Sequence, residues 1–280
     1  ATVHGNTLTD NVWGIQTDHA APTLSSNLVL GSSQDGISIN NSLRDDNYID
    51  FLAHAVILHN TVANSGRNGI HVEGLSISDQ PVAPSLIANL TLENTSAGVH
   101  ITGTPTTNGN VSWNNGVSAF DGFTPDASDT EVDPLVVDAA NGDWSLSADS
   151  PLVDAGLEDG FGSDWDAGGS LRVTDGDGDG SAVADVGALE LCPDLDGDGW
   201  AQDCSTGEAY DCDDDNADIS PDAEETWYDG VDQNCDGNRR DTNRKRRTHR
   251  YQQLGNKVRS TNCLAKWSAP SHAFRSCILR

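Results

Sequence analysis

The chain of 280 residues has no methionine and, before residue 239, few basic side chains. Because position 1 is not Met, we expect a fragment or a processed form, so a missing signal peptide carries no weight. Up to residue 238 there are three basic and 43 acidic side chains, a formal charge of −40. Such a surface repels nucleic acid phosphates and anionic membranes, so no nucleic acid partner is expected. No apolar run approaches the roughly 20 residues that span a bilayer, which excludes a transmembrane segment.

Cysteine is absent from the first 191 residues, and four of the six cysteines crowd into one short acidic segment. Cysteines in a small segment poor in apolar residues predict disulfides and an oxidising compartment. Zinc is the weaker interpretation, because C-x-x-C spacing and nearby His are both missing. The four are Cys192, Cys204, Cys212 and Cys235.

A short phrase recurs five times before residue 121: a polar turn led by Asn, then Gly, then an apolar–polar–apolar strand. One such strand cannot bury its apolar face alone, so the copies must stack as a solenoid. The leading residues are Asn6, Asn27, Asn60, Asn89 and Asn110, at separations of 21, 33, 29 and 21. A separation near 21 suits one coil of a parallel β-helix, and the longer ones imply loops inserted around 44–51 and 74–84.

Stacked coils lie about 4.8 Å apart, so equivalent side chains form columns. We expect the Asn column to link its amides and the Gly before each strand to make a sharp turn. In the fifth copy, Gly116 is the aligned glycine, and Val117 and Ala119 take the apolar positions. The outward columns are then Gln16/Ser38/His71/His100/Ser118 and Asp18/Asn40/Glu73/Thr102/Phe120.

The phrase from Asn60 to Ile70 resembles the parallel β-helix repeats of secreted pectate-lyase-like proteins. Residues 133–190 resemble the terminal region of a bacterial surface subgroup of that superfamily. The matching pieces are Asp133-Pro134, Gly142-Asp-Trp144-Ser-Leu146, Ser150-Pro-Leu-Val-Asp-Ala-Gly156, Arg172 and Asp185-Val-Gly-Ala-Leu-Glu190. The resemblance implies an all-β fold, a right-handed parallel β-helix over residues 1–190. Five coils are short for such a helix, so we expect further N-terminal coils to be missing.

Residues 191–237 hold 16 acidic residues and no Lys, Arg or His. They resemble the metal-binding repeat of bacterial surface proteins. The matching residues are Asp194-Leu-Asp196-Gly-Asp198-Gly199, Asp211-Cys-Asp-Asp-Asp215, Pro221, Glu225 and Trp227-Tyr-Asp229-Gly-Val-Asp232-Gln-Asn-Cys235-Asp-Gly237. Proximity and the resemblance favour the disulfides Cys192–Cys204 and Cys212–Cys235 among three possible connectivities. We expect a small, irregular, disulfide-stapled module.

The tail, residues 238–280, is strongly basic, with a formal charge of +11 from residue 239 onward. We expect it to be disordered. Two interpretations stay open: a reading-frame artefact, or a genuine basic arm that binds anionic polymers.

A D-x-D-x-D-G loop brings carboxylates at positions 1, 3 and 5 to one cation, and the carbonyl after the last Gly can join them. Asp194, Asp196, Asp198 and the Trp200 carbonyl match this pattern, but Ser205 stands where an EF-hand has Glu. Oxygen ligands favour Ca²⁺ over transition metals; the alternative is a solvated acidic linker. The remaining ligands are sought among Asp203, Asp211, Asp213, Asp215, Asp218, Glu225, Asp229 and Asp232. A weaker Ca²⁺ site with the same spacing is predicted at Asp175, Asp177 and Asp179, with Asp185 nearby.

The outward columns are the place to look for catalysis. The weak candidates are Arg67, His71, Glu73 and His100, and the simpler interpretation is a solvated strand face. We therefore expect a secreted or cell-surface bacterial protein that binds Ca²⁺ and has a structural or adhesive role, in contact with extracellular polysaccharide or surface proteins. The alternative is a polysaccharide lyase or glycoside hydrolase of the pectate-lyase-like superfamily.

Overall fold

The computed structural model describes residues 1–18, 20–41, 55–74, 83–157, 164–201, 211–226 and 229–237. Within these ranges the chain is all-β, with one 3-10 turn, η2 (Ala139–Asn141), and no α-helix. The same ranges hold no helix long and apolar enough to cross a membrane. The basic tail lies outside the described residues.

The chain forms two compact units. The first comprises residues 1–224 with 233–236, and the second comprises residues 225–232 with 237–280. The acidic segment is thus divided between the two units, and a domain boundary after residue 190 stays a prediction.

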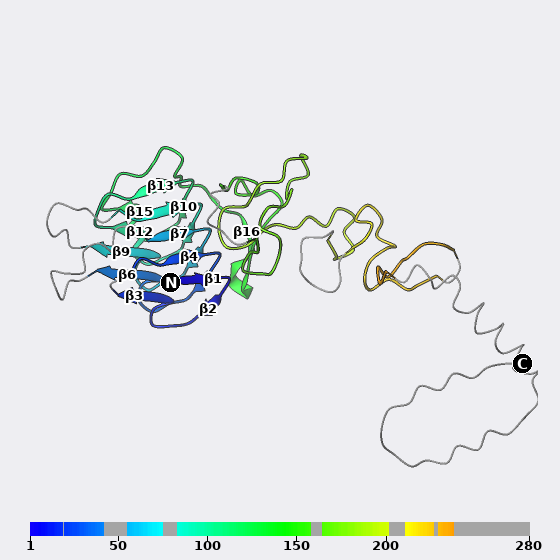
Figure 1. Cartoon of the computed structure of the whole chain (residues 1–280), viewed down its shortest axis with the longest axis horizontal. Helices are drawn as coiled ribbons and strands as arrows, with labels where there is room; N and C mark the ends of the chain where they lie inside the picture. Colours follow the sequence, from blue (N-terminus) through cyan, green and yellow to red (C-terminus); the bar gives the residue numbers. More distant parts are fainter. Residues whose placement is uncertain are drawn as a thin grey trace, which may run out of the picture. The chain divides into compact units, whose positions relative to one another are not determined.

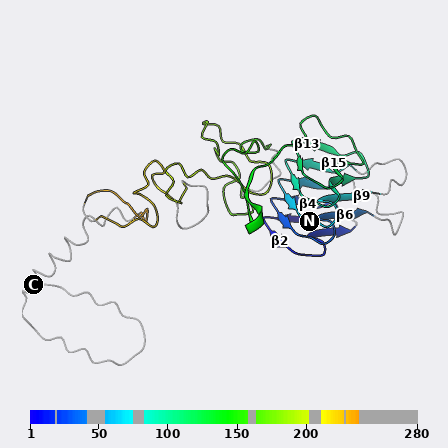
Figure 2. The same ribbon diagram turned by 180° about the vertical axis from the view of Figure 1, so that it is seen from behind.

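Fifteen short strands stack in three parallel sheets of five, and each coil adds one strand to each sheet (Figure 1; Figure 2 shows the other side). The first sheet contains β1 (Thr2–His4), β4 (Thr23–Ser25), β7 (Val56–Leu58), β10 (Ser85–Ile87) and β13 (Thr106–Asn108). The second contains β2 (Thr7–Thr9), β5 (Leu28–Leu30), β8 (Thr61–Ala63), β11 (Leu90–Leu92) and β14 (Val111–Trp113). The third contains β3 (Ile15–Asp18), β6 (Ile37–Asn41), β9 (Ile70–Gly74), β12 (Ala97–Ile101) and β15 (Ser118–Asp121). The predicted solenoid is therefore confirmed as a five-coil parallel β-helix.

The core runs along the inside of the coils. Alternate strand residues point inward, and the central ones are fully buried, among them Leu24, Ile57, Ile70 and Val99. Each buried side chain of this size contributes about 1.5–3 kcal/mol of hydrophobic free energy. Because one coil supplies only a few of these residues, each coil depends on its neighbours for a closed core.

The Asn column forms a continuous hydrogen-bonded ladder, as predicted. The Nδ2 atom of Asn27 donates to Asn60 Oδ1 at 2.9 Å, and Asn60 Nδ2 donates to Asn89 Oδ1 at 2.9 Å. Asn89 continues to Asn110 at 2.9 Å, and Asn110 donates to Asp129 Oδ1 at 2.8 Å. The ladder therefore ends on a carboxylate that the repeat pattern did not indicate.

Glycine recurs before the strands for a different reason from the sharp turn that was predicted. Gly36 and Gly69 do not have positive φ. A Cβ at Gly69 would lie 2.7 Å from the Gly98 carbonyl oxygen of the next coil, so close stacking requires the glycine there. Residues with positive φ, in the left-handed region, occur at two other corners of each coil, for example His59 (φ 48°) and Asn64 (φ 56°).

The predicted register of the fifth coil is wrong by three residues. His100 pairs with Asp121 instead of Ser118, and Val99 pairs with Phe120 instead of Val117. Val117 is 76% exposed, whereas Phe120 packs against the core. The Asn ladder imposes a step of 21 residues between the fourth and fifth coils, and with this step Phe120, which is larger than Val117, turns toward the core.

The terminal region covers the outer face of the second sheet. An antiparallel hairpin of β16 (Val136–Asp138) and β17 (Asp143–Leu146) supplies Trp144 and Leu146, which pack with Leu90 and Leu92 in a second core. The β8 and β11 strands are consequently buried on both faces.

Polar contacts fasten the end of this region to the coils. The Gly187 N–H donates to the Ala88 carbonyl at 3.0 Å, and the Ala188 N–H donates to Thr61 Oγ1 at 2.8 Å. The buried Arg172 Nη1 lies 3.0 Å from Glu190 Oε1. Gly187 and Ala188 are thus hydrogen-bonded directly to the coils, and Arg172 holds the residues that follow them through Glu190.

We predict that Asn60→Ala lowers the free energy of unfolding by at least about 3 kcal/mol, because it leaves several buried partners of one amide without hydrogen bonds. Urea denaturation followed by circular dichroism measures this change. Asn11→Ala is the control: its exposed Nδ2 donates to the Thr9 carbonyl at 3.2 Å, so its effect should stay below about 0.5 kcal/mol. Equal effects of the two substitutions would contradict the structural role of the ladder.

Candidate metal centre

The loop from Asp194 to Trp200 is held by its own carboxylates. Asp194 accepts hydrogen bonds from the N–H groups of Gly197 at 2.7 Å and Gly199 at 2.9 Å. Asp196 Oδ1 accepts from the Asp198 N–H, and Asp198 Oδ1 accepts from the Trp200 N–H. Gly197 and Gly199 have φ of 80° and 96°, a left-handed conformation that glycine adopts without strain.

A second segment brings further carboxylates to this loop. The Asp211 N–H donates to the Ala201 carbonyl at 3.1 Å, and the Leu195 N–H donates to Asp214 Oδ1 at 3.3 Å. Asp211 is fully buried and Asp214 is 5% exposed. The segment thus packs directly against the loop through these two residues.

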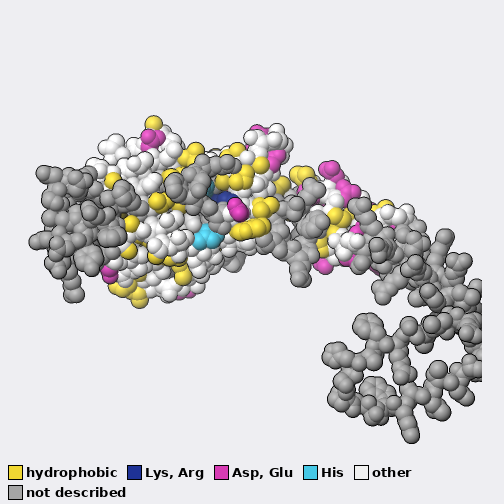
Figure 3. Space-filling model, viewed as in Figure 1, with side chains coloured by type: hydrophobic (Ala, Val, Ile, Leu, Met, Phe, Trp, Pro, Cys, Tyr) yellow, Lys and Arg dark blue, Asp and Glu magenta, His cyan; other side chains and the backbone are white. Residues whose placement is uncertain are grey.

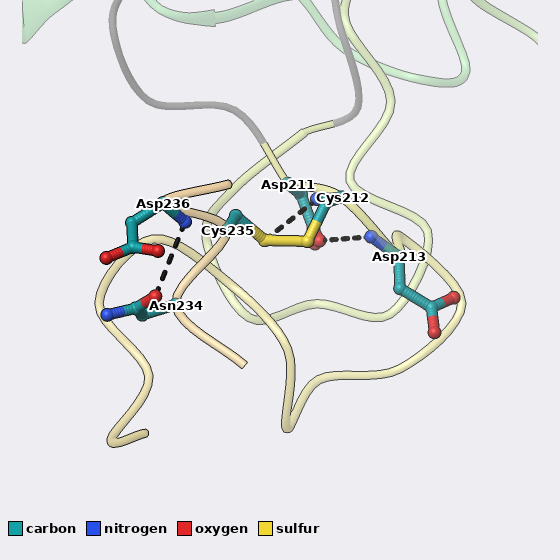
Figure 4. The surroundings of a disulfide bond; sticks show 6 residues. All are labelled: Asp211, Cys212, Asp213, Asn234, Cys235 and Asp236. Atoms are coloured by element: carbon teal, nitrogen blue, oxygen red, sulfur yellow. Dashed lines mark hydrogen bonds between the residues drawn. A yellow bond between two sulfur atoms is a disulfide. The ribbon is translucent and has the colours of Figure 1, made fainter. Parts of the chain in front are cut away.

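A disulfide joins Cys212 to Cys235 beside this segment, as the sequence predicted (Figure 4). Asp211 and Asp213 flank Cys212, and the Asp213 N–H donates to Asp211 Oδ1 at 2.8 Å. The Ser220 N–H also donates to the Gln233 carbonyl. The bond therefore holds residues 233–236 against the segment that carries Asp211 and Asp214. The predicted Cys192–Cys204 pair involves Cys204, which lies outside the described residues.

Five carboxylates form two groups that share Asp196. One group is Asp194, Asp196 and Asp214, and the other is Asp196, Asp198 and Asp211. In each group one oxygen per residue lies within 4.8 Å of the others. Within the part of the chain that the structure describes, the Oδ2 atoms of Asp196, Asp198 and Asp211 are buried and accept no hydrogen bond. Buried oxygens without donors are costly, and a cation bound here would compensate for the missing donors.

Burial and crowding shift the pKa of two carboxyl groups in the cluster. Burial, together with the neighbouring carboxylates, raises the pKa of Asp196 and of Asp214 above the usual value for aspartate. Hydrogen bonds from backbone N–H groups oppose the shift but do not cancel it. A divalent ion would favour the charged forms that this crowding disfavours.

The predicted ligand set divides into three parts. Asp194, Asp196, Asp198 and Asp211 come together, and Asp214 joins them in place of its exposed neighbours Asp213 and Asp215. One sequence signal could have indicated this: Asp214 follows Asp211 by three residues, and that spacing in a turn returns a side chain to the same side. Asp203 lies outside the described residues. Asp218 is exposed in the first unit, and Glu225, Asp229 and Asp232 belong to the second unit. The acidic groups found in the described ranges include none of these last four.

The weaker acidic loop adopts the same pattern of hydrogen bonds. The Gly180 N–H donates to Asp175 Oδ2 at 2.8 Å, as Gly199 does to Asp194. Asp175 and Asp177 form a group with Asp154, which the sequence did not indicate. Asp179 is not in this group, and its Oδ1 accepts from the Ser181 N–H at 2.8 Å.

Asp185 binds backbone groups of the terminal region. It is buried and accepts hydrogen bonds from the N–H groups of Asp154 at 2.8 Å and Leu191 at 2.6 Å. Burial raises the pKa of Asp185 to about 6, although these hydrogen bonds act in the opposite direction. Its oxygens therefore serve the terminal region and not the nearby acidic group.

Three of the four catalytic candidates lie together on the outer face of the third sheet. His71 and His100 pair on neighbouring strands, and Arg67 lies in the turn before His71. Glu73 pairs with Asn40, two residues further along β9. Asp35 and Asp121 complete the cluster. Both were missed, because Asp35 precedes its strand and Asp121 depends on the register of the fifth coil.

Comparison with known proteins identifies only the acidic part. Residues 211–239 match the family model Cu-binding_MopE, described as "Putative metal-binding motif". No curated protein and no solved structure matches the chain. The matched segment begins at Asp211 and contains Asp214 and the Cys212–Cys235 disulfide, so the match includes two of the five clustered carboxylates.

We predict that Asp196→Asn raises the melting temperature at pH 7 when divalent ions are removed by EDTA. The native pKa of Asp196 is raised, so a proton on it stabilises the folded state, and this stabilisation is lost as the pH rises through that pKa. Asn mimics the protonated form at every pH. The difference between the two proteins should therefore vanish near pH 3, where both are neutral at this position. A difference that stays constant from pH 3 to pH 7 would contradict the crowding of these carboxylates.

Proposed function

We propose that this chain is an extracellular, Ca²⁺-binding β-helix protein of the bacterial surface, with a structural or adhesive role. The observation that carries the proposal is the convergence of five carboxylates from two segments, three of them with buried oxygens that find no donor among the described residues. An ion at this place would join the loop of residues 194–200 to the segment of residues 211–214.

The chemistry of the ligands favours calcium. Every candidate ligand in the cluster is a carboxylate oxygen, and residues 191–237 contain no His or Met. Cys212 and Cys235 are joined in a disulfide, so neither offers a thiolate. Copper prefers imidazole, thiolate or thioether ligands, whereas Ca²⁺ takes six to eight oxygens in flexible geometry.

A structural role follows from the small apolar content of the acidic segment. Among the described residues after 190, only one apolar side chain is buried, that of Ile219. Such a segment has little hydrophobic free energy to offset its chain entropy, so the disulfide and the ion must supply the rest. Ion binding is then coupled to folding of this segment.

The surface and the disulfide support the proposed location. Acidic side chains recur on the face drawn in Figure 3, where basic ones hardly show. A stable disulfide is typical of proteins outside the reducing cytosol. A stiff coil stack that ends in an ion-stabilised segment suits a spacer in contact with extracellular polysaccharide or neighbouring surface proteins.

Calorimetric titration of the full chain with Ca²⁺ tests the proposal. We expect Asp196→Asn, which removes the carboxylate shared by both groups, to weaken binding at least tenfold. Asp215→Asn is the matched control, because Asp215 is exposed and belongs to neither group; it should change the affinity less than twofold. Equal affinities of wild type and Asp196→Asn, or uptake of Cu²⁺ with no uptake of Ca²⁺, would refute the proposal.

We also predict that Ca²⁺ protects the Cys212–Cys235 disulfide from reduction. If reduction passes through the unfolded segment, Ca²⁺ at 100 times its dissociation constant suppresses this opening by about 100-fold. The measurement is the rate at which dithiothreitol exposes Cys212 to alkylation, followed by mass spectrometry. An equal rate of alkylation in Ca²⁺ and in EDTA would show that ion binding does not protect the disulfide.

A further inference from the structure

A second, chemically different site lies on the outer face of the third sheet. His71 of β9 and His100 of β12 stand directly opposite each other on neighbouring coils. Their ring centroids are 5.2 Å apart, with an angle of 61° between the ring planes. Both side chains are partly exposed, at 16% and 28%, so an ion can reach the pair from solvent.

Two carboxylates hold the rings from opposite sides. Asp35 Oδ2 lies 3.2 Å from His71 Nδ1, and Asp121 Oδ2 lies 2.7 Å from His100 Nδ1. In the third sheet the strands follow in the order β6, β9, β12 and β15. Asp35 precedes β6 and Asp121 ends β15, so the two Nδ1 atoms are drawn away from each other along the stack. A ring drawn outward by Nδ1 presents Nε2 on its other side, toward the partner ring.

The carboxylates also determine the tautomer. An anionic carboxylate only accepts hydrogen bonds, so each neutral ring carries its proton on Nδ1 and leaves a lone pair on Nε2. Within the described ranges, neither Nε2 atom makes a hydrogen bond. A carboxylate behind a histidine is the arrangement that orients metal-binding imidazoles and raises their basicity.

Asp35 is itself fixed in place. It is 2% exposed, and its Oδ1 accepts hydrogen bonds from Asn68 N at 3.1 Å and Asn68 Nδ2 at 2.9 Å. Arg67 Nη1, at 3.9 Å from Asp35 Oδ2, adds a positive charge nearby. The carboxylate that faces His71 Nδ1 is therefore held in place by Asn68.

The ring spacing is that of two imidazoles on one ion. In a tetrahedral site each nitrogen lies about 2.0–2.1 Å from the metal, and each ring centre lies about 1.1 Å behind its nitrogen. Two imidazoles on one ion then have their ring centroids about 5 Å apart. The observed separation of 5.2 Å agrees with this value. Imidazole nitrogens select Zn²⁺ and its late first-row neighbours over Ca²⁺.

We propose that His71 and His100 bind one Zn²⁺-like divalent ion through their Nε2 atoms, with Asp35 and Asp121 as positioning residues. The protein supplies two ligands, so the remaining positions are left to water or to an oxygen or nitrogen group of a molecule outside the coils. This site is independent of the proposed Ca²⁺ centre, because it uses nitrogen ligands on the β-helix and not carboxylates of the acidic segment.

The test is titration of the full chain with Zn²⁺ while the acidic groups are saturated with millimolar Ca²⁺. We expect one Zn²⁺ per chain, and an affinity loss of at least tenfold in His71→Gln and in His100→Gln. His4→Gln is the matched control, because the His4 ring contacts Ser25 on the first sheet; its affinity should match that of wild type. Unchanged Zn²⁺ affinity in both histidine variants, or no uptake by the Ca²⁺-saturated wild type, would overturn the proposal.

Asp121→Asn tests the positioning role. Asp121 is 54% exposed, so its replacement should leave the fold intact, whereas a change at the buried Asp35 would also remove its hydrogen bonds with Asn68. We expect a 10–100-fold lower Zn²⁺ affinity. Nitrogen NMR of His100 should also show a larger fraction of the tautomer protonated on Nε2. Wild-type affinity together with an unchanged tautomer ratio would contradict the role of Asp121.

Discussion

The hydrogen-bonded ladder of buried Asn side chains is the constraint on which the rest of the structure depends. Each amide joins two coils and also satisfies backbone groups, so Asn60, for example, links Asn27, Asn89 and the carbonyls of Leu24 and Leu58. A shift of one coil by a single residue would break all of these contacts at once. The ladder therefore fixes which side chains face each other on every sheet.

The histidine pair on the third sheet is a direct consequence of that register. His71 faces His100 because the Asn ladder sets the step between their coils at 29 residues. Asp121 faces His100 because the next step is 21. A cluster of charged and imidazole groups thus arises on this face, although each single strand shows only the usual alternation of apolar and polar residues.

The acidic segment follows a different principle. Its carboxylates use one oxygen to hold the loop through backbone N–H groups, as Asp196 and Asp198 do, and direct the other into a common space. The β-helix gains stability from apolar burial and amide pairing. The acidic segment concentrates like charges, which repel one another, and a bound cation would offset this repulsion.

The sequence predicted those features that depend on local spacing. The Asn separations predicted the coils, and the D-x-D-x-D-G spacing predicted that Asp194, Asp196 and Asp198 share one loop. Features that depend on packing were missed. The fifth coil was misaligned on Gly116, because a match of residue types said nothing of whether Phe120 or Val117 would fill the core. Asp214 and Asp154 were missed because their approach to the loops is set by the tertiary fold.

The coils close in the same register although the connections after the third sheet differ in length. Four residues join β3 to β4, fourteen join β6 to β7, ten join β9 to β10, and four join β12 to β13. The strands on either side keep their pairing throughout. This corner is therefore open to evolutionary elaboration: new recognition loops can be grafted beside the histidine face at little cost to the scaffold, since longer chain there adds only a slowly growing closure entropy.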